Sequence, residues 1–222
     1  LMSDIFREVD EDIRRDQLEQ LWKRYGGIVM ALALVIVVGV GGYRAWNWYQ
    51  ARQASAEGEA FFAAVDLAEQ GKKEEAAAAF NALASQGGAY SDLARLRSAA
   101  TSAAGGDHAG ALAAYRDIAA DTGVDPLFRE IATIRAAYLE AGTLSPDEME
   151  GRVGAMLDPQ NAFRHAAREL MALSAYAAGD IEATAKWAEE ATADGDLPPN
   201  LRQRLEVLLS VIASQRAAKE TS

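Results

Sequence analysis

The pattern of apolar and polar residues divides the chain into two parts. From Gly26 to Tyr43 the sequence has 18 residues without a charged side chain. A helix rises about 1.5 Å per residue, so this run is about 27 Å long, close to the hydrocarbon core of a bilayer, which is about 30 Å thick. After residue 51 the apolar residues are mostly alanines that recur with a helical period. We therefore expect one membrane-length helix followed by a domain of shorter amphipathic helices.

Aromatic residues flank the apolar run on both sides, and such amphipathic rings are typical of the two lipid headgroup layers. Glycines within the run are tolerated in lipid, because the only alternative to helical hydrogen bonds there is an unsatisfied backbone. We therefore predict a transmembrane helix at residues 25–49 that contacts the lipid bilayer through residues 26–43. The predicted membrane-interface anchors are Trp22, Tyr25, Trp46, Trp48 and Tyr49.

Two alternatives to an anchor are a cleaved signal peptide and a helix buried in a protein core. A signal peptide has a short basic head, an apolar core of about 7–15 residues and a nearby small-residue cleavage site. Here the head is mixed in charge, and the only comparable site, Ala54-Ser55-Ala56, lies well beyond the run. These features favour the anchor.

Basic residues around the run predict its orientation, because cytoplasmic flanks carry the excess of Lys and Arg. Five basic residues precede the run and two follow it closely: Arg7, Arg14, Arg15, Lys23 and Arg24 before, and Arg44 and Arg52 after. We expect a single-pass protein with residues 1–24 as its cytoplasmic segment and residues 50–222 on the far side of the membrane. In a bacterium that membrane is the inner membrane and residues 50–222 are a periplasmic domain, whereas in an organelle the same asymmetry gives the equivalent space.

Glycines interrupt the alanine-rich part at nearly even intervals. Gly71, Gly106, Gly142 and Gly179 are separated by 35, 36 and 37 residues. Each glycine lies between two helical segments, and glycine permits the positive-φ turn that often ends a helix. Spacing of this kind is typical of solenoids that stack helix pairs.

The segments after these glycines resemble one another. "GKKEEAAAAF" and "GDHAGALAAY" each place an alanine five residues and an aromatic residue nine residues after the glycine, whereas "GDIEATAKWA" has its aromatic, Trp187, one place earlier. They resemble the turn and second helix of a tetratricopeptide unit. In this interpretation the alanine lets two helices approach closely, and the aromatic ring fills the space between units.

Other signals mark helix starts. Ser145-Pro146-Asp147-Glu148 is typical of an N-cap, a first-turn proline and a capping-box glutamate, and we expect Asp125-Pro126 and Asp158-Pro159 to act in the same way. Pro198-Pro199 precedes a last helix, at about residues 200–217, with a single apolar face that is typical of a solenoid cap. The third unit is degenerate, because its second helix, residues 145–157, is short.

These patterns predict an all-α fold: a single N-terminal transmembrane helix, then a tetratricopeptide-like α-solenoid of about four helix pairs plus a C-terminal capping helix. An ordinary alanine-rich bundle is the alternative. The chain has a formal net charge of −11, and residues 51–222 account for −10 of it. An acidic surface repels phosphate backbones, so we expect no nucleic acid partner.

Candidate chemistry is sparse. The chain has no cysteine, and its two histidines, His108 and His165, are 57 residues apart, whereas a zinc site needs three or four ligands. Neighbouring acids such as Glu74-Glu75 diverge on a helix surface and form no catalytic dyad. We therefore predict no catalytic residue, no cofactor, no metal and no enzyme activity. An enzyme whose site is assembled from scattered acids is the rival hypothesis.

A protein-binding surface remains. First helices of repeat units line the inner curve of a solenoid, where partners usually dock. Inter-helix core is the alternative role of these positions. The predicted partner-binding residues are Phe61, Val65, Leu93, Leu96, Leu139, Leu173 and Tyr176.

Two stretches resemble a known family. "QLEQLWKRYGG" precedes the apolar run, and "YRAWNWYQARQASAEGEAFFAA" follows it. With the repeat domain, this layout resembles the ancillary SecYEG translocon subunit family of proteobacteria, the YfgM-like proteins. The resemblance implies a periplasmic domain that associates with Sec translocon subunits and periplasmic folding factors, and it carries over no catalytic residue.

We therefore expect a non-enzymatic accessory protein of protein export, anchored in the inner membrane, that binds the Sec translocon, periplasmic chaperones or both through its repeat domain. The alternative is a membrane-anchored scaffold for envelope or cell-division complexes.

Overall fold

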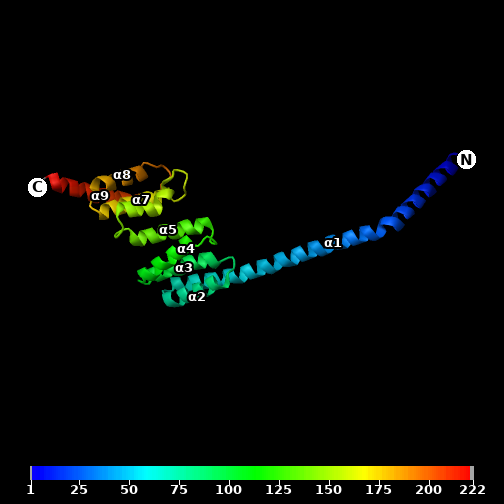
Figure 1. Cartoon of the computed structure of the whole chain (residues 1–222), viewed down its shortest axis with the longest axis horizontal. Helices are drawn as coiled ribbons and strands as arrows, with labels where there is room; N and C mark the ends of the chain where they lie inside the picture. The colour runs from blue at the N-terminus through cyan, green and yellow to red at the C-terminus, as the bar shows by residue number, and fades with distance from the viewer. Residues whose placement is uncertain (1, 221–222) are drawn as a thin grey trace. The chain divides into compact units, whose positions relative to one another are not determined.

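The computed structural model describes the backbone of residues 2–220 and the side chains of residues 22–217. Every regular element in that range is a helix (Figure 1), which confirms the all-α prediction. The predicted basic flank at Arg7, Arg14 and Arg15 lies outside the described side chains. The elements are α1 (Met2–Glu69), α2 (Lys73–Gln86), α3 (Ser91–Ala104), α4 (His108–Ala120), α5 (Pro126–Glu140), α6 (Pro146–Val153), the 3₁₀ helix η1 (Gly154–Leu157), α7 (Arg164–Ala177), α8 (Ile181–Thr192) and α9 (Pro199–Glu220).

The chain divides into two compact units, the first ending at Ala56 and the second beginning at Glu57. The apolar run lies in the first unit, within α1, and its glycines do not interrupt the helix. Within the described residues one segment, Trp22–Glu69, is long and apolar enough to cross a membrane, and its most apolar 18-residue window has a mean hydropathy of 2.2 and is 6% buried. Burial this low favours an anchor or a signal over a helix in a protein core.

The second unit stacks helix pairs in chain order. Residues 57–69 of α1 pair with α2, α3 pairs with α4, α5 with α6, and α7 with α8, while α9 packs against α8 and α7 at the end of the stack. This arrangement confirms the prediction of four pairs and a capping helix. The short α6, followed by η1, confirms that the third pair is degenerate.

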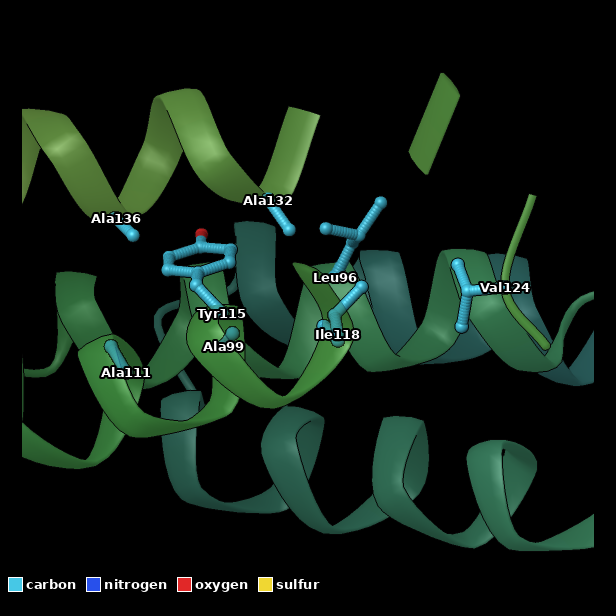
Figure 2. Packing of buried hydrophobic residues seen from close by; sticks show 8 residues of the cluster. All are labelled: Leu96, Ala99, Ala111, Tyr115, Ile118, Val124, Ala132 and Ala136. Atoms are coloured by element: carbon cyan, nitrogen blue, oxygen red, sulfur yellow. The ribbon is translucent and has the colours of Figure 1, made fainter. Parts of the chain in front are cut away.

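The core positions of the repeat are those that the alanine and aromatic spacing predicts. Ala76 and Phe80 on α2 and Ala111 and Tyr115 on α4 are all buried. Figure 2 shows Tyr115 among residues of α3, α4 and α5, so its ring fills the space between two successive pairs. In the fourth pair, the positions five and nine residues after Gly179 are Thr184 and Ala188, and both are fully buried. Trp187 is half-buried and contacts two apolar clusters.

Three of the four predicted glycine turns have the expected geometry. Gly71, Gly106 and Gly179 have φ values of 78°, 95° and 80°. Each turn has the two crossing hydrogen bonds of a Schellman motif; at Gly106, for example, Asp107 N donates to Ser102 O and Gly106 N to Ala103 O.

The expectation of a positive-φ turn at Gly142 is wrong. Its φ is not positive. The α5–α6 connection instead continues in a right-handed turn, in which Thr143 N and Leu144 N both donate to Glu140 O. Glycine is therefore not required by the backbone at this position.

The predicted helix starts agree with the structure at two of three sites. Ser145 and Glu148 form the capping box of α6, and Asp125 caps α5, whose first residue is Pro126. Asp158-Pro159 starts no helix, because Asp158 accepts a hydrogen bond from Gln160 N in a turn, and α7 begins only at Arg164 without a side-chain cap.

Candidate partner-binding groove

Three cavities of the repeat domain lie along the first helices of successive pairs. The first, of 280 Å³, lies between α1, α2 and α3. The second, of 210 Å³, lies between α3, α4 and α5, and the third, of 380 Å³, between α5, α7 and α9. Shared residues connect them: Arg97 and Ala100 line the first and second, and Arg135 lines the second and third. We call the three together the first-helix groove.

The central cavity combines apolar walls with polar groups. Leu93 and Phe128 belong to its walls, and Arg97 and Arg135 contribute exposed side chains to its rim. Tyr115 also lines it, although the residue as a whole is only 3% exposed. In Figure 2 the hydroxyl of Tyr115 faces α5, and it has no hydrogen-bond partner among the described residues.

The electrostatics of this cavity keep the phenol protonated. Burial raises the pKa of Tyr115, and the positive charges of Arg135 and Arg97 oppose that rise. A protonated phenol can donate a hydrogen bond, and a guanidinium group is a donor only. The central cavity therefore presents donors to a ligand.

The third cavity is crossed by a fixed polar brace. Glu169 on α7 is 2% exposed, and Arg204 on α9 donates to both of its carboxylate oxygens, from Nε and Nη2, at 2.6 Å each. Tyr138 on α5 donates to Glu169 Oε2 at 2.5 Å. Burial is the largest cause of the raised pKa of Tyr138, followed by its hydrogen bond to Glu169. This brace joins three helices and leaves Arg204 already paired.

The seven predicted binding residues fall into two groups. Val65, Leu93, Leu96 and Leu173 line the groove. The other three do not: Phe61 packs against Phe80 with ring centroids 5.4 Å apart, Leu139 packs on the α3–α5 core, and the hydroxyl of Tyr176 accepts a hydrogen bond from Gln215 at 3.1 Å. Partner binding by any of them stays a prediction.

Sequence reasoning missed the polar residues of the groove. The predicted binding residues are apolar positions of first helices and do not include Arg97, Arg135 or Tyr115. One signal was available for the arginines. Each follows a large aliphatic residue and precedes two small residues, in "LRSAA" and "IRAA", so the same groove-facing position recurs in consecutive pairs.

The histidines and acids lie away from the groove. His165 is buried with Nε2 2.8 Å from Asp194 Oδ2, and Arg164 Nε donates to the same oxygen at 3.0 Å. His108 is the exposed first residue of α4. Among the described residues, no group of three or more His, Cys, Asp or Glu side chains could hold a metal ion.

Stacked helix pairs with a groove along their first helices define a helical-repeat solenoid. A family model described as a tetratricopeptide repeat-like domain matches residues 19–212, and the chain belongs to this family. Domains of this family are typically non-catalytic modules for protein–protein interaction. No curated protein and no solved structure matches the chain significantly.

Proposed function

We propose that this chain is a membrane-tethered, non-enzymatic accessory protein of protein export whose repeat domain docks protein partners in the first-helix groove. The observation that carries the proposal is the continuous groove on an interaction domain of the tetratricopeptide repeat-like family. Connected cavities along several helices suit a partner segment better than a single small molecule, because no one of them encloses a ligand.

The membrane tether is supported by the exposed apolar surface of residues 26–43. Leaving so much contiguous apolar surface in water is unfavourable, by about 25 cal/mol per Å², and monomeric soluble proteins rarely do so. In this proposal residues 25–49 span the inner membrane, residues 1–24 lie in the cytoplasm and residues 50–222 form the periplasmic domain.

Sec translocon subunits and periplasmic folding factors are the partners we propose. The resemblance of the flanking sequences to the YfgM-like family supports this choice. A tether beside the channel raises the effective concentration of the domain to about the millimolar range, so weak contacts in the groove suffice. A scaffold for envelope or cell-division complexes is the alternative.

A photocrosslinking amino acid placed at Val65 or Leu173, both of which line the groove, tests this proposal in intact membranes. We expect both positions to trap translocon subunits or folding factors. The matched control is the exposed Lys186 on α8, which lines none of the three cavities. Crosslinks only to division or envelope proteins support the alternative and contradict a role in export.

A further inference from the structure

We propose that the first-helix groove selects an extended, acidic segment of a partner protein, and that Arg97, Arg135 and Tyr115 bind its carboxylates. This inference rests on the proposed use of the groove as a docking surface and names the chemistry of the partner. It follows from charge, burial and spacing in the central cavity.

Unpaired positive charge marks the centre of the groove. No carboxylate lines the central cavity, and neither Arg97 nor Arg135 has an ion-pair partner among the described residues. Most arginines of the repeat domain do pair with carboxylates: Arg95, Arg116, Arg152, Arg164, Arg168, Arg204 and Arg216. In a domain with a net charge of −10, two free guanidinium groups on neighbouring first helices are the natural place for a partner's acids.

Tyr115 adds a neutral donor at the same place. Tyr115 lines the central cavity, and its hydroxyl has no hydrogen-bond partner in the described part of the chain. The oxygen itself is not fully buried, so a ligand that enters the cavity can reach it. Two guanidinium groups and a phenol together suit a carboxylate, which is an acceptor only and takes several hydrogen bonds.

The apolar walls and the helix spacing define the rest of the segment. Leu93, Phe128 and Ile131 in the central cavity, and Leu173 in the third, offer apolar contacts. Packed helices lie about 8–10 Å apart, and an extended chain advances about 3.3 Å per residue. One residue in about three therefore reaches each successive cavity, so the matching segment has an apolar residue every third position and acids between.

Charge elsewhere on the domain restricts such a segment to the groove. The acidic surface repels an acidic segment. In the first cavity Glu69 is exposed beside Lys73, and in the third Glu169 is already paired with Arg204. The central cavity is therefore where the segment gains most from its carboxylates.

The test uses the full chain in nanodiscs of zwitterionic lipid and a fluorescent peptide, (Leu-Glu-Glu)4, with binding followed by fluorescence anisotropy. The comparison peptides are (Leu-Gln-Gln)4 and (Leu-Lys-Lys)4. We expect the acidic peptide to bind at least about tenfold more tightly than the other two, the equivalent of one charge-assisted hydrogen bond.

Substitutions locate the site. Arg97→Gln and Arg135→Gln should each weaken binding of the acidic peptide about tenfold, and the double substitution Arg97→Glu with Arg135→Glu should reverse the preference toward (Leu-Lys-Lys)4. The control is Arg129→Gln on α5. Arg129 forms no close ion pair among the described residues, although its charge acts on Asp121, and it lines none of the three cavities. Circular dichroism melting of each variant confirms that the domain is folded.

Equal binding of all three peptides overturns the inference, and so does unchanged affinity in the Arg97 and Arg135 variants. An equal loss of peptide affinity in the Arg129 control overturns it as well. Free glutarate binding as tightly as the peptide indicates a small-anion site and also overturns it. Self-association that the double substitution abolishes, without peptide binding, assigns the groove to a second copy and also overturns it.

Because the assay needs no export machinery, failed selectivity with intact translocon crosslinks refutes only this inference. Intact selectivity with no such crosslinks refutes only the export role.

Discussion

At the scale of single residues, the buried carboxylate of Glu169 makes the strongest demand on its neighbours. A buried charge is tolerated only when it is paired and hydrogen-bonded, and Glu169 is held by Arg204 and Tyr138. Arg204 is itself 51% exposed at its side chain. Water can therefore reach the site in part when the arginine is removed, which limits the cost.

We predict that Arg204→Met destabilises the repeat domain by about 2–3 kcal/mol, because it leaves the Glu169 carboxylate short of donors. For a domain of this size, that loss lowers the melting temperature by about 4–12 °C, measured by circular dichroism. The double substitution Glu169→Met with Arg204→Met should cost less than Arg204→Met alone, because no buried charge is left unpaired. A double variant less stable than either single variant would contradict this account.

A second residue-scale prediction concerns Asp194 and acid. The hydrogen bond from Arg164 is the largest cause of its lowered pKa, followed by those from the Asp196 backbone and from His165. A group whose pKa is lower in the folded state stabilises the fold above its unfolded pKa, about 3.9. That contribution is lost as the pH falls toward the folded value.

Asp194→Asn should therefore lower the melting temperature at pH 7 and flatten its decline below about pH 4. Scanning calorimetry at pH 7 and at a series of pH values below about 4 measures both effects. Asp196→Asn is the control, because the Asp196 side chain is 87% exposed and contacts only Arg164, at 3.5 Å. An acid decline as steep in Asp194→Asn as in the unmodified chain refutes the assignment.

At the scale of elements, two glycines of the same repeat series differ in what the backbone requires. Gly106 has a φ of 95° in a Schellman turn, whereas Gly142 does not have a positive φ. A Cβ atom added at either position would meet nothing within 4 Å. Backbone conformation is therefore the only local difference between alanine substitutions at the two sites.

Gly106→Ala should destabilise the domain by about 1–2 kcal/mol, because a left-handed conformation is unfavourable for an L-residue. Gly142→Ala should be neutral or stabilising by up to about 1 kcal/mol, because alanine restricts the unfolded chain more than glycine does. Thermal melts of the two variants, side by side, decide the matter. Equal losses at both positions would refute the distinction.

These elements also show what the sequence can and cannot predict. Helix pairs, the capping helix and the buried alanine and aromatic positions follow from period and spacing, because each repeats along the chain. The predictions at Gly142 and at Asp158-Pro159 are wrong because glycine and proline mark a break in a helix without specifying the backbone conformation that follows. At Gly142 that conformation depends on hydrogen bonds to Glu140 O, and at Asp158 on the hydrogen bond from Gln160 N.

The groove was only partly predictable for a related reason. Its apolar residues follow from helix position, as Leu93 and Leu173 show. Whether an arginine is free or paired depends on residues that are distant in sequence. Arg204 meets Glu169, whereas Arg135 meets no carboxylate among the described residues.

At the scale of the whole molecule, every proposed role depends on where the repeat domain resides, and that depends on the apolar run. Basic residues before the run favour a cytoplasmic N-terminus. A cleaved signal would leave the domain in the same compartment but free of the membrane, so compartment and attachment require separate measurements.

We predict that alkaline phosphatase fused to the C-terminus is active in bacterial cells, and that the chain stays in the membrane fraction after carbonate extraction. Placing one arginine at Val35 and another at Val38, both exposed on the apolar run, should release the chain, because each charge at a helix centre costs about 2.5–3.5 kcal/mol of insertion. The control substitutes Ala51 and Gln53 by arginine, outside the run, and should stay membrane-bound. A mature N-terminus beyond Ala56 establishes cleavage instead of anchoring, and an inactive phosphatase fusion places the domain in the cytoplasm. Either result removes the tether beside the export channel, whereas acidic-peptide selectivity of the groove is an independent property.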